Sequence, residues 1–148
     1  MKTEITSGDL SGAWRLRSWL IHYDDGRDAG APFGPRPDGL LLYHPDGWMS
    51  ATVHRPGREP FPDGLSPREL DSERVAGAYW SYFHYAGTFH IEGDCVIHDV
   101  KHSLNPGMAG TRQVRRMTLE EPRLVLEGIE ELAQGARRHE LLWQRYDP

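Results

Sequence analysis

This sequence has little of several features, and each scarcity excludes a class of protein. Its one cysteine, Cys95, excludes an intramolecular disulfide and fits a reducing compartment. No apolar run is long enough to cross a membrane, and the first nine residues contain no apolar stretch. We therefore expect no membrane segment and no signal peptide, and we expect a cytoplasmic protein.

Excess positive charge and the common nucleotide and acyl-transfer motifs are also missing. Lys and Arg number 17 against 22 Asp and Glu, which leaves a formal net charge of −5. The one basic cluster, Arg112, Arg115 and Arg116, is too small to form the basic face that nucleic acid requires. Without a glycine-rich phosphate loop, a serine elbow or a Cys–His pair, nucleotide binding and acyl-enzyme chemistry are not expected.

Turn-forming residues are frequent, with 16 glycines and 11 prolines, and 148 residues suit a single domain that spans 1–148. A helix is expected from about Pro67 to Phe83, because Ser66 can cap it and Glu69 completes a capping box. Alternation of apolar and polar residues predicts eight strands, at Gly12–His22, Gly39–His44, Trp48–His54, Tyr85–Glu92, Cys95–Leu104, Thr111–Leu119, Arg123–Glu127 and Arg137–Tyr146.

Short and long connections alternate between these strands. Short turns follow the second, fourth and sixth strands, and long loops follow the others, including one at 128–136. In an up-and-down meander this pattern puts the short turns at a closed bottom and the loops at an elaborated top. The prediction is an all-β, eight-stranded antiparallel barrel with one helix between strands three and four, where the helix could act as a lid.

Gly12-Ala13-Trp14, at the start of the first strand, is the Gly-x-Trp pattern of the closed base of lipocalins. The chain resembles the bacterial and fungal lipocalin-like domain family over nearly its whole length. That resemblance implies a barrel whose relatives include natural-product cyclases, isomerases and lyases as well as proteins that only bind, and it carries over no catalytic signature. His102 departs from the family pattern, in which an apolar residue is usual. The matching segments are Gly12–Leu16, Pro37–Tyr43, Pro45–Ser50, Tyr85–Phe89, Ser103–Pro106, Gly110–Arg116 and His139–Trp143.

Period-two alternation assigns an inner face to most strands. For strands two and three, a bulged turn at 45–47 would put Tyr43 inside, whereas a tight turn would send His44 inward instead. Seven polar groups are expected on the inner wall: His22, Tyr85, His98, His102, Gln113, Arg115 and His139. Because a filled apolar core would exclude so many polar groups, their presence indicates a cavity open to water and ligand.

A catalytic group is expected near the mouth, where the turn at 93–94 would set His102 opposite Tyr85, with Gln113 beside it and Arg115 one step deeper. His102 and Tyr85 could carry out acid–base chemistry, and Arg115 could pair with a carboxylate, phenolate or enolate. A structural role for each of these groups remains an alternative. Further ligand contacts are expected from His22, Tyr43, Tyr82, Phe89, His98, Gln113, His139 and Trp143.

No metal site and no organic cofactor are expected. His98 and His102 lie about 13 Å apart along a strand, too far for one zinc ion, although a cross-strand site of His22, His102 and His139 stays open. We predict a cofactor-independent cyclase, isomerase or lyase that acts on a largely apolar, oxygenated, polyketide-like molecule from secondary metabolism. The alternative is a non-catalytic carrier of such a hydrophobic molecule. Two copies of the chain could also pair as a homodimer.

Overall fold

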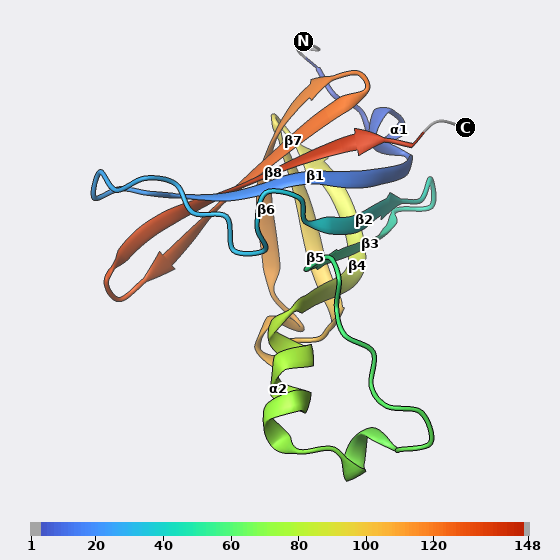
Figure 1. The fold of residues 1–148 in the computed structure, drawn as a ribbon. Coiled ribbons are helices and arrows are strands. Elements are labelled where there is room, and N and C mark those ends of the chain that lie inside the picture. The colour runs from blue at the N-terminus through green and yellow to red at the C-terminus, as the bar shows by residue number, and fades with distance from the viewer. Residues whose placement is uncertain (1–3, 147–148) are drawn as a thin grey trace.

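Eight antiparallel strands close into a barrel in which each strand pairs with the next and β8 returns to β1 (Figure 1). The computed structural model describes residues 4–146, so the first three residues considered for a signal peptide lie outside the described residues. The predicted fold class, with its helix between strands three and four, is confirmed. The strands are β1 Gly12–Tyr23, β2 Asp38–Tyr43, β3 Trp48–His54, β4 Tyr82–Glu92, β5 Cys95–Ser103, β6 Arg112–Glu120, β7 Arg123–Leu132 and β8 Gly135–Arg145.

The predicted single helix is divided into two elements. The capping box of Ser66 and Glu69 is present, but it begins only one 3-10 turn, η1 Pro67–Glu69. A new cap at Asp71 then starts α2 Ser72–Trp80, which ends before β4 begins. Two further short elements, α1 Ser7–Leu10 and η2 Pro106–Met108, were not predicted.

The closed end of the barrel is built around Trp14. Its ring is fully buried, and its Nε1 donates a hydrogen bond to the carbonyl of Leu10 at 2.9 Å. Leu10 itself, at the end of α1, is also fully buried. The guanidinium of Arg145 stacks over the Trp14 ring, 4.0 Å from its centroid. This end is therefore packed solid, which leaves the opposite end for a cavity.

Two register shifts reverse the expected alternation. In β1, the shift between Leu16 and Ser18 turns Trp19 toward the barrel interior, so the predicted inward orientation of His22 is wrong. In β5, a shift opposite Ala86 and Gly87 leaves Lys101 without a paired residue and pairs His102 with Ala86. Each bulge adds one residue, and one residue is enough to exchange the two faces of a strand.

The turn between β2 and β3 has the bulged form. Gly47 has a φ of +94°, a conformation that glycine adopts without steric cost, and Tyr43 pairs with Met49. As a result Tyr43, Leu41 and Met49 face the core, and His44 is exposed.

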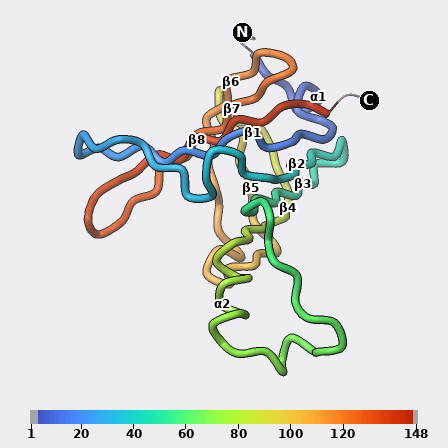
Figure 2. The backbone as a smooth tube through the Cα atoms, viewed as in Figure 1, coloured from blue at the N-terminus to red at the C-terminus, as the bar shows by residue number. Residues whose placement is uncertain are grey.

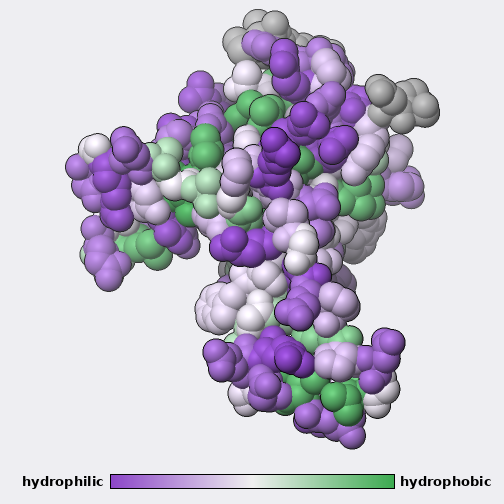
Figure 3. Space-filling model, in the orientation of Figure 1, coloured by the Kyte–Doolittle hydropathy of each residue, from purple (hydrophilic) through white to green (hydrophobic). Residues whose placement is uncertain are grey.

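The β7–β8 connection and the α2 region depart from the prediction. The expected loop at 128–136 is a continuation of the hairpin, since pairing runs on to Leu132 and Gly135. The segment with η1 and α2 projects away from the barrel (Figures 1 and 2), and it exposes Leu65, Val75 and Trp80 on a lobe where Figure 3 shows hydrophobic surface. Within residues 4–146, no helix is both long and apolar enough to span a membrane.

Candidate functional site

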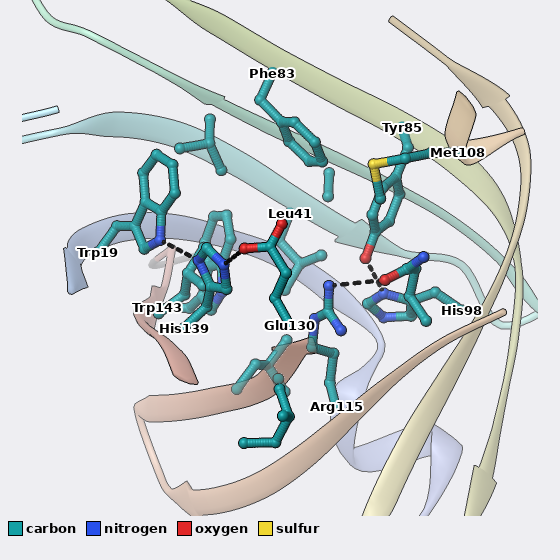
Figure 4. Close-up of a pocket in the computed structure, with 17 residues that line it drawn as sticks. Trp19, Leu41, Phe83, Tyr85, His98, Met108, Arg115, Glu130, His139 and Trp143 are labelled. Atoms are coloured by element: carbon teal, nitrogen blue, oxygen red, sulfur yellow. Dashed lines mark hydrogen bonds and ion pairs between the residues drawn. The ribbon is translucent and has the colours of Figure 1, made fainter. Parts of the chain in front are cut away.

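A cavity of about 240 Å³ lies inside the barrel, on the side away from Trp14, and Figure 4 shows its wall. None of its lining residues comes from α2, so the structure gives that helix no place over the cavity as a lid. Most of the wall is apolar, with a few polar side chains on β4 to β8. The lining residues are Trp19, Leu41, Ala51, Val53, Phe83, Tyr85, His98, Met108, Gln113, Arg115, Leu126, Gly128, Ile129, Glu130, His139, Leu141 and Trp143.

Most of the predicted site residues lie in or directly behind this wall. Pairing runs without a register shift in β6, in β8 against β7, and in β5 as far as Val100. There the residues predicted on the inner wall, His98, Gln113, Arg115 and His139, line the cavity. Tyr43 and Phe89 are buried behind the lining, with ring centroids 4.6 Å apart. The predicted residues that line the cavity are Tyr85, His98, Gln113, Arg115, His139 and Trp143.

His102 does not lie in the cavity, and its predicted inward orientation is wrong. The bulge at Lys101 pairs His102 with Ala86 and exposes it, while Ser103 takes the place opposite Tyr85. The expected row of neighbours is wrong as well, because Gln113 pairs with His98 and Arg115 with Val96.

His22 and Tyr82 also lie outside the cavity wall. The β1 bulge turns His22 to the outer face, where its Nε2 meets Glu140 Oε1 at 3.0 Å. Tyr82, predicted as a ligand contact, instead stacks on His54, with ring centroids 5.6 Å apart. The cross-strand metal site left open above is not assembled, and residues 4–146 contain no cluster of three His, Cys, Asp or Glu side chains suited to a metal ion.

A buried hydrogen-bonded chain of two tyrosines and a histidine forms one side of the site. The Tyr43 hydroxyl lies 2.7 Å from His98 Nε2, and the Tyr85 hydroxyl lies 2.6 Å from His98 Nδ1. Burial, together with the charge of Arg115, lowers the pKa of His98 to about 3, so the imidazole is neutral at physiological pH. Burial also raises the pKa of Tyr85, against the opposing charge of Arg115, so Tyr85 keeps its proton.

Arg115 brings the cation of the site into the apolar cavity. Its Nη2 donates to Gln113 Oε1 at 3.3 Å, and Gln113 is in turn held by its Nε2 donating to Thr111 Oγ1 at 2.9 Å. Gly128, on β7, leaves room for the guanidinium, since a Cβ there would lie 2.6 Å from Arg115 Nη1. Within residues 4–146, Arg115 forms no ion pair with a carboxylate.

Glu130 and His139 form a second polar group on the wall (Figure 4). Trp19 Nε1 can only donate, so its 3.1 Å contact fixes His139 Nδ1 as the acceptor and leaves the proton on Nε2. That Nε2 donates to Glu130 Oε1 at 2.8 Å, and Arg137 Nε donates to the same oxygen at 2.6 Å. Burial works to raise the pKa of Glu130, but these two donors outweigh it and hold the pKa below its usual value. The carboxylate of Glu130 is thus already paired, with His139 and Arg137.

Hydrogen-bond donors are in excess on the wall. Besides Arg115, Trp143 lines the cavity, and its Nε1 is the buried side-chain nitrogen that lacks a partner in the described part of the chain. A surplus of donors in an apolar cavity suits a ligand that brings acceptor oxygens.

Sequence reasoning missed Trp19, Gly128 and Glu130. The signal for Trp19 is the break in apolar alternation, which runs Trp14, Leu16 and then Trp19, as expected when a bulge intervenes. The inner phase of Leu124 and Leu126 continues through Gly128 to Glu130, and only the assignment of 128–136 as a loop concealed it.

Comparison with known proteins adds the family. The model of a family described as "Lipocalin-like domain" matches residues 11–146. No curated protein matches the chain. A complex of bovine odorant binding protein with a selenium-containing odorant is 14% identical, with a TM-score of 0.47, covering 100% of this chain and 77% of that chain. The complex of bovine odorant binding protein with undecanal is 16% identical, with a TM-score of 0.48, covering 100% of this chain and 78% of that chain. At this level of likeness, the ligands of the bovine protein do not transfer to this chain.

Proposed function

We propose that this chain, which belongs to the lipocalin-like domain family, binds one small, largely apolar molecule in its barrel and holds an acidic oxygen of that molecule on Arg115. The observation that carries the proposal is a guanidinium inside an apolar cavity with no carboxylate partner in the described chain. A part-buried cation loses hydration, and a ligand carboxylate or enolate would compensate for that loss.

The size and lining of the cavity support the rest of the proposal. A cavity of about 240 Å³ suits a compound of one or two rings. Trp19, Phe83 and Leu141 supply apolar surface, and burial of a ligand against it contributes roughly 25 cal/mol per Å². The ligand would therefore consist of an apolar body with one oxygen-bearing end.

Titration with 2-naphthoate, followed by quenching of tryptophan fluorescence, tests this function, because Trp19 and Trp143 line the cavity. Replacing Arg115 by Met keeps the length of the side chain and removes its charge. We expect Arg115→Met to weaken 2-naphthoate binding by about tenfold or more, since charge-assisted hydrogen bonds contribute about 1.5–3 kcal/mol. Binding of 2-ethylnaphthalene, which has no oxygen, should be unchanged.

Arg116→Met is the matched control, since Arg116 is the next residue of β6 and is exposed on its outer face near Asp94. If Arg115→Met and Arg116→Met affect 2-naphthoate binding equally, Arg115 does not hold the acidic group. If the wild-type protein binds neither naphthalene compound, the proposal of a cavity for apolar molecules is wrong.

Acid–base catalysis is the second candidate function, and a specific arrangement favours it. Tyr85 and Arg115 could hold the oxygen of a ketone as its enolate, while Glu130, on the same cavity wall, could accept a proton from the adjacent carbon. Such proton transfer is the step shared by the cofactor-independent cyclisations, isomerisations and eliminations expected from the sequence. Without this proton transfer, the protein would be a carrier that binds the molecule and releases it unchanged.

Hydrogen–deuterium exchange distinguishes the catalyst from the carrier. The protein is incubated in D₂O with 2-acetylnaphthalene, and loss of the methyl proton signal is followed by NMR. Catalysis predicts exchange above the buffer rate that Glu130→Gln slows, whereas exchange at the buffer rate with the ketone bound supports the carrier.

A further inference from the structure

The hydrogen-bond partners of Tyr43 restrict the protonation of its neighbours. Tyr43 is 2% exposed, and within residues 4–146 the single hydrogen-bond partner of its hydroxyl is His98 Nε2. Arg115 is the charged group that acts on Tyr43, and a guanidinium has no acceptor to offer. The hydroxyl proton of Tyr43 therefore has one available acceptor, the imidazole of His98.

A neutral imidazole carries one proton and one lone pair, so two arrangements of the chain are conceivable. If His98 is protonated on Nε2, it donates to Tyr43, whose own proton is then buried without an acceptor. If His98 is protonated on Nδ1, Tyr43 donates to Nε2 and Nδ1 donates to Tyr85. An unpaired buried hydroxyl is costly enough to favour the second arrangement by about tenfold or more.

The second arrangement decides what Tyr85 can do. Its oxygen accepts a hydrogen bond from His98, so its own proton is not used within the chain. Tyr85 lines the cavity, and Figure 4 shows its hydroxyl near the guanidinium of Arg115. Arg115 can only donate, so it cannot take up that proton. The Tyr85 proton is left for a group inside the cavity.

We propose that Tyr43 and His98 are positioning residues that hold the Tyr85 hydroxyl as a hydrogen-bond donor to an acceptor oxygen of the ligand. The inference rests on the proposed function and deepens it, because it states the chemical class of the ligand end. Tyr85 and Arg115 together offer donors only. The site selects a carbonyl, carboxylate or enolate oxygen over an ammonium group, which has no lone pair to accept these donors.

The protonation of His98 is measured directly by long-range ¹H–¹⁵N correlation of the imidazole groups in the ligand-free protein at pH 7. The sequence has 8 histidines, and the spectrum of His98→Gln identifies the signals of His98 by their loss. We expect a protonated Nδ1 and a bare Nε2. A bare Nδ1 with a protonated Nε2 overturns the proposal.

Tyr43→Phe tests the role of Tyr43 with a readout that packing alone does not change. Without the Tyr43 hydroxyl, neither nitrogen is preferred, so the His98 signals should move toward a mixture of the two tautomers. An unchanged His98 spectrum in a folded Tyr43→Phe protein overturns the assignment of Tyr43 as a positioning residue.

Binding of two matched probes tests the donor itself. We expect Tyr85→Phe to weaken binding of 2-acetylnaphthalene by about fivefold, the effect of one hydrogen bond, and to leave 2-ethylnaphthalene within about twofold of wild type. Equal weakening of both probes means that Tyr85 only fills space, which overturns the inference while the proposed function stands. If the wild-type protein binds neither probe, the proposed function fails and the inference fails with it.

Discussion

Gly128→Ala should displace the side chain of Arg115 from the cavity without any substitution of Arg115 itself. The added Cβ would lie 2.6 Å from Nη1 and 2.8 Å from Cζ of Arg115, closer than real contacts allow, and 3.0 Å from Cδ, which is tighter than most. Gly128 is not among the glycines with positive φ, so an alanine fits the backbone there. The strain is therefore relieved by the side chain of Arg115, which has to swing out of its present position.

The expected effects of Gly128→Ala on stability and on ligand affinity have separate physical causes. Alanine at a compatible glycine position stabilises a fold by about 0.4–1 kcal/mol, and we expect the free energy of unfolding to change by no more than about 1 kcal/mol in either direction. Displacing the guanidinium removes a charge-assisted contact to an acidic ligand, worth about 2 kcal/mol. That loss corresponds to about a thirtyfold weaker affinity for 2-naphthoate.

A double-mutant cycle measures this effect by fluorescence titration of wild type, Gly128→Ala, Arg115→Met and the double variant. If Gly128 acts through Arg115, the alanine should have no further effect once Arg115 is Met, which gives a coupling energy near 2 kcal/mol. Additive losses would refute the reasoning, because they would show that the alanine simply fills the cavity. An equal loss of affinity for 2-ethylnaphthalene would refute it in the same way.

Three further changes test other parts of the structure. Because the pKa of His98 in the fold, about 3, lies below its ordinary value of 6.5, the stability that it contributes is complete above pH 6.5 and is lost as the pH falls toward 3. Urea unfolding should show about 3 kcal/mol less stability at pH 4 than at pH 7 from this group, and a His98→Gln protein with the same pH dependence would contradict it. His102→Ala should change neither 2-naphthoate affinity nor stability by more than about 0.5 kcal/mol, since the side chain is exposed, and a larger loss of affinity would return His102 to the site. Trp14→Ala should cost about 3–5 kcal/mol in urea unfolding, because it empties the closed end between Leu10 and Arg145; a cost under 1 kcal/mol would show that this end is not tightly packed.

The barrel was predictable because apolar alternation marks each strand independently. His98, Gln113 and Arg115 were placed correctly on the inner wall from that pattern. Their strands are regular over these residues, so counting by twos from an apolar residue gives the correct face. The turn at 45–47 left two registers open, because turn type depends on backbone geometry that the residue types alone did not decide.

The errors came from interruptions of that regularity. His22 and His102 each follow a bulged residue, and one uncounted residue exchanges inside for outside along the rest of the strand. In β1 the apolar residues change phase and mark the bulge. In β5 no apolar residue follows Val100 until Leu104, so nothing in the pattern shows that the phase has changed. Glu130 was missed because a hairpin with charged residues resembles a solvated loop.

The two bulges also determine where this chain can change length. Removing Lys101 would let Val100 and His102 follow one another as regular neighbours, and both would keep the faces that they have now. The same holds for Arg17 between Leu16 and Ser18. A deletion at either position is thus absorbed locally, whereas a deletion elsewhere in β1 or β5 would exchange the inner and outer faces of that strand beyond the deleted residue. In relatives of this protein, single-residue gaps at these two positions should be compatible with an unchanged interior, and alignments are best anchored on the cavity residues to either side.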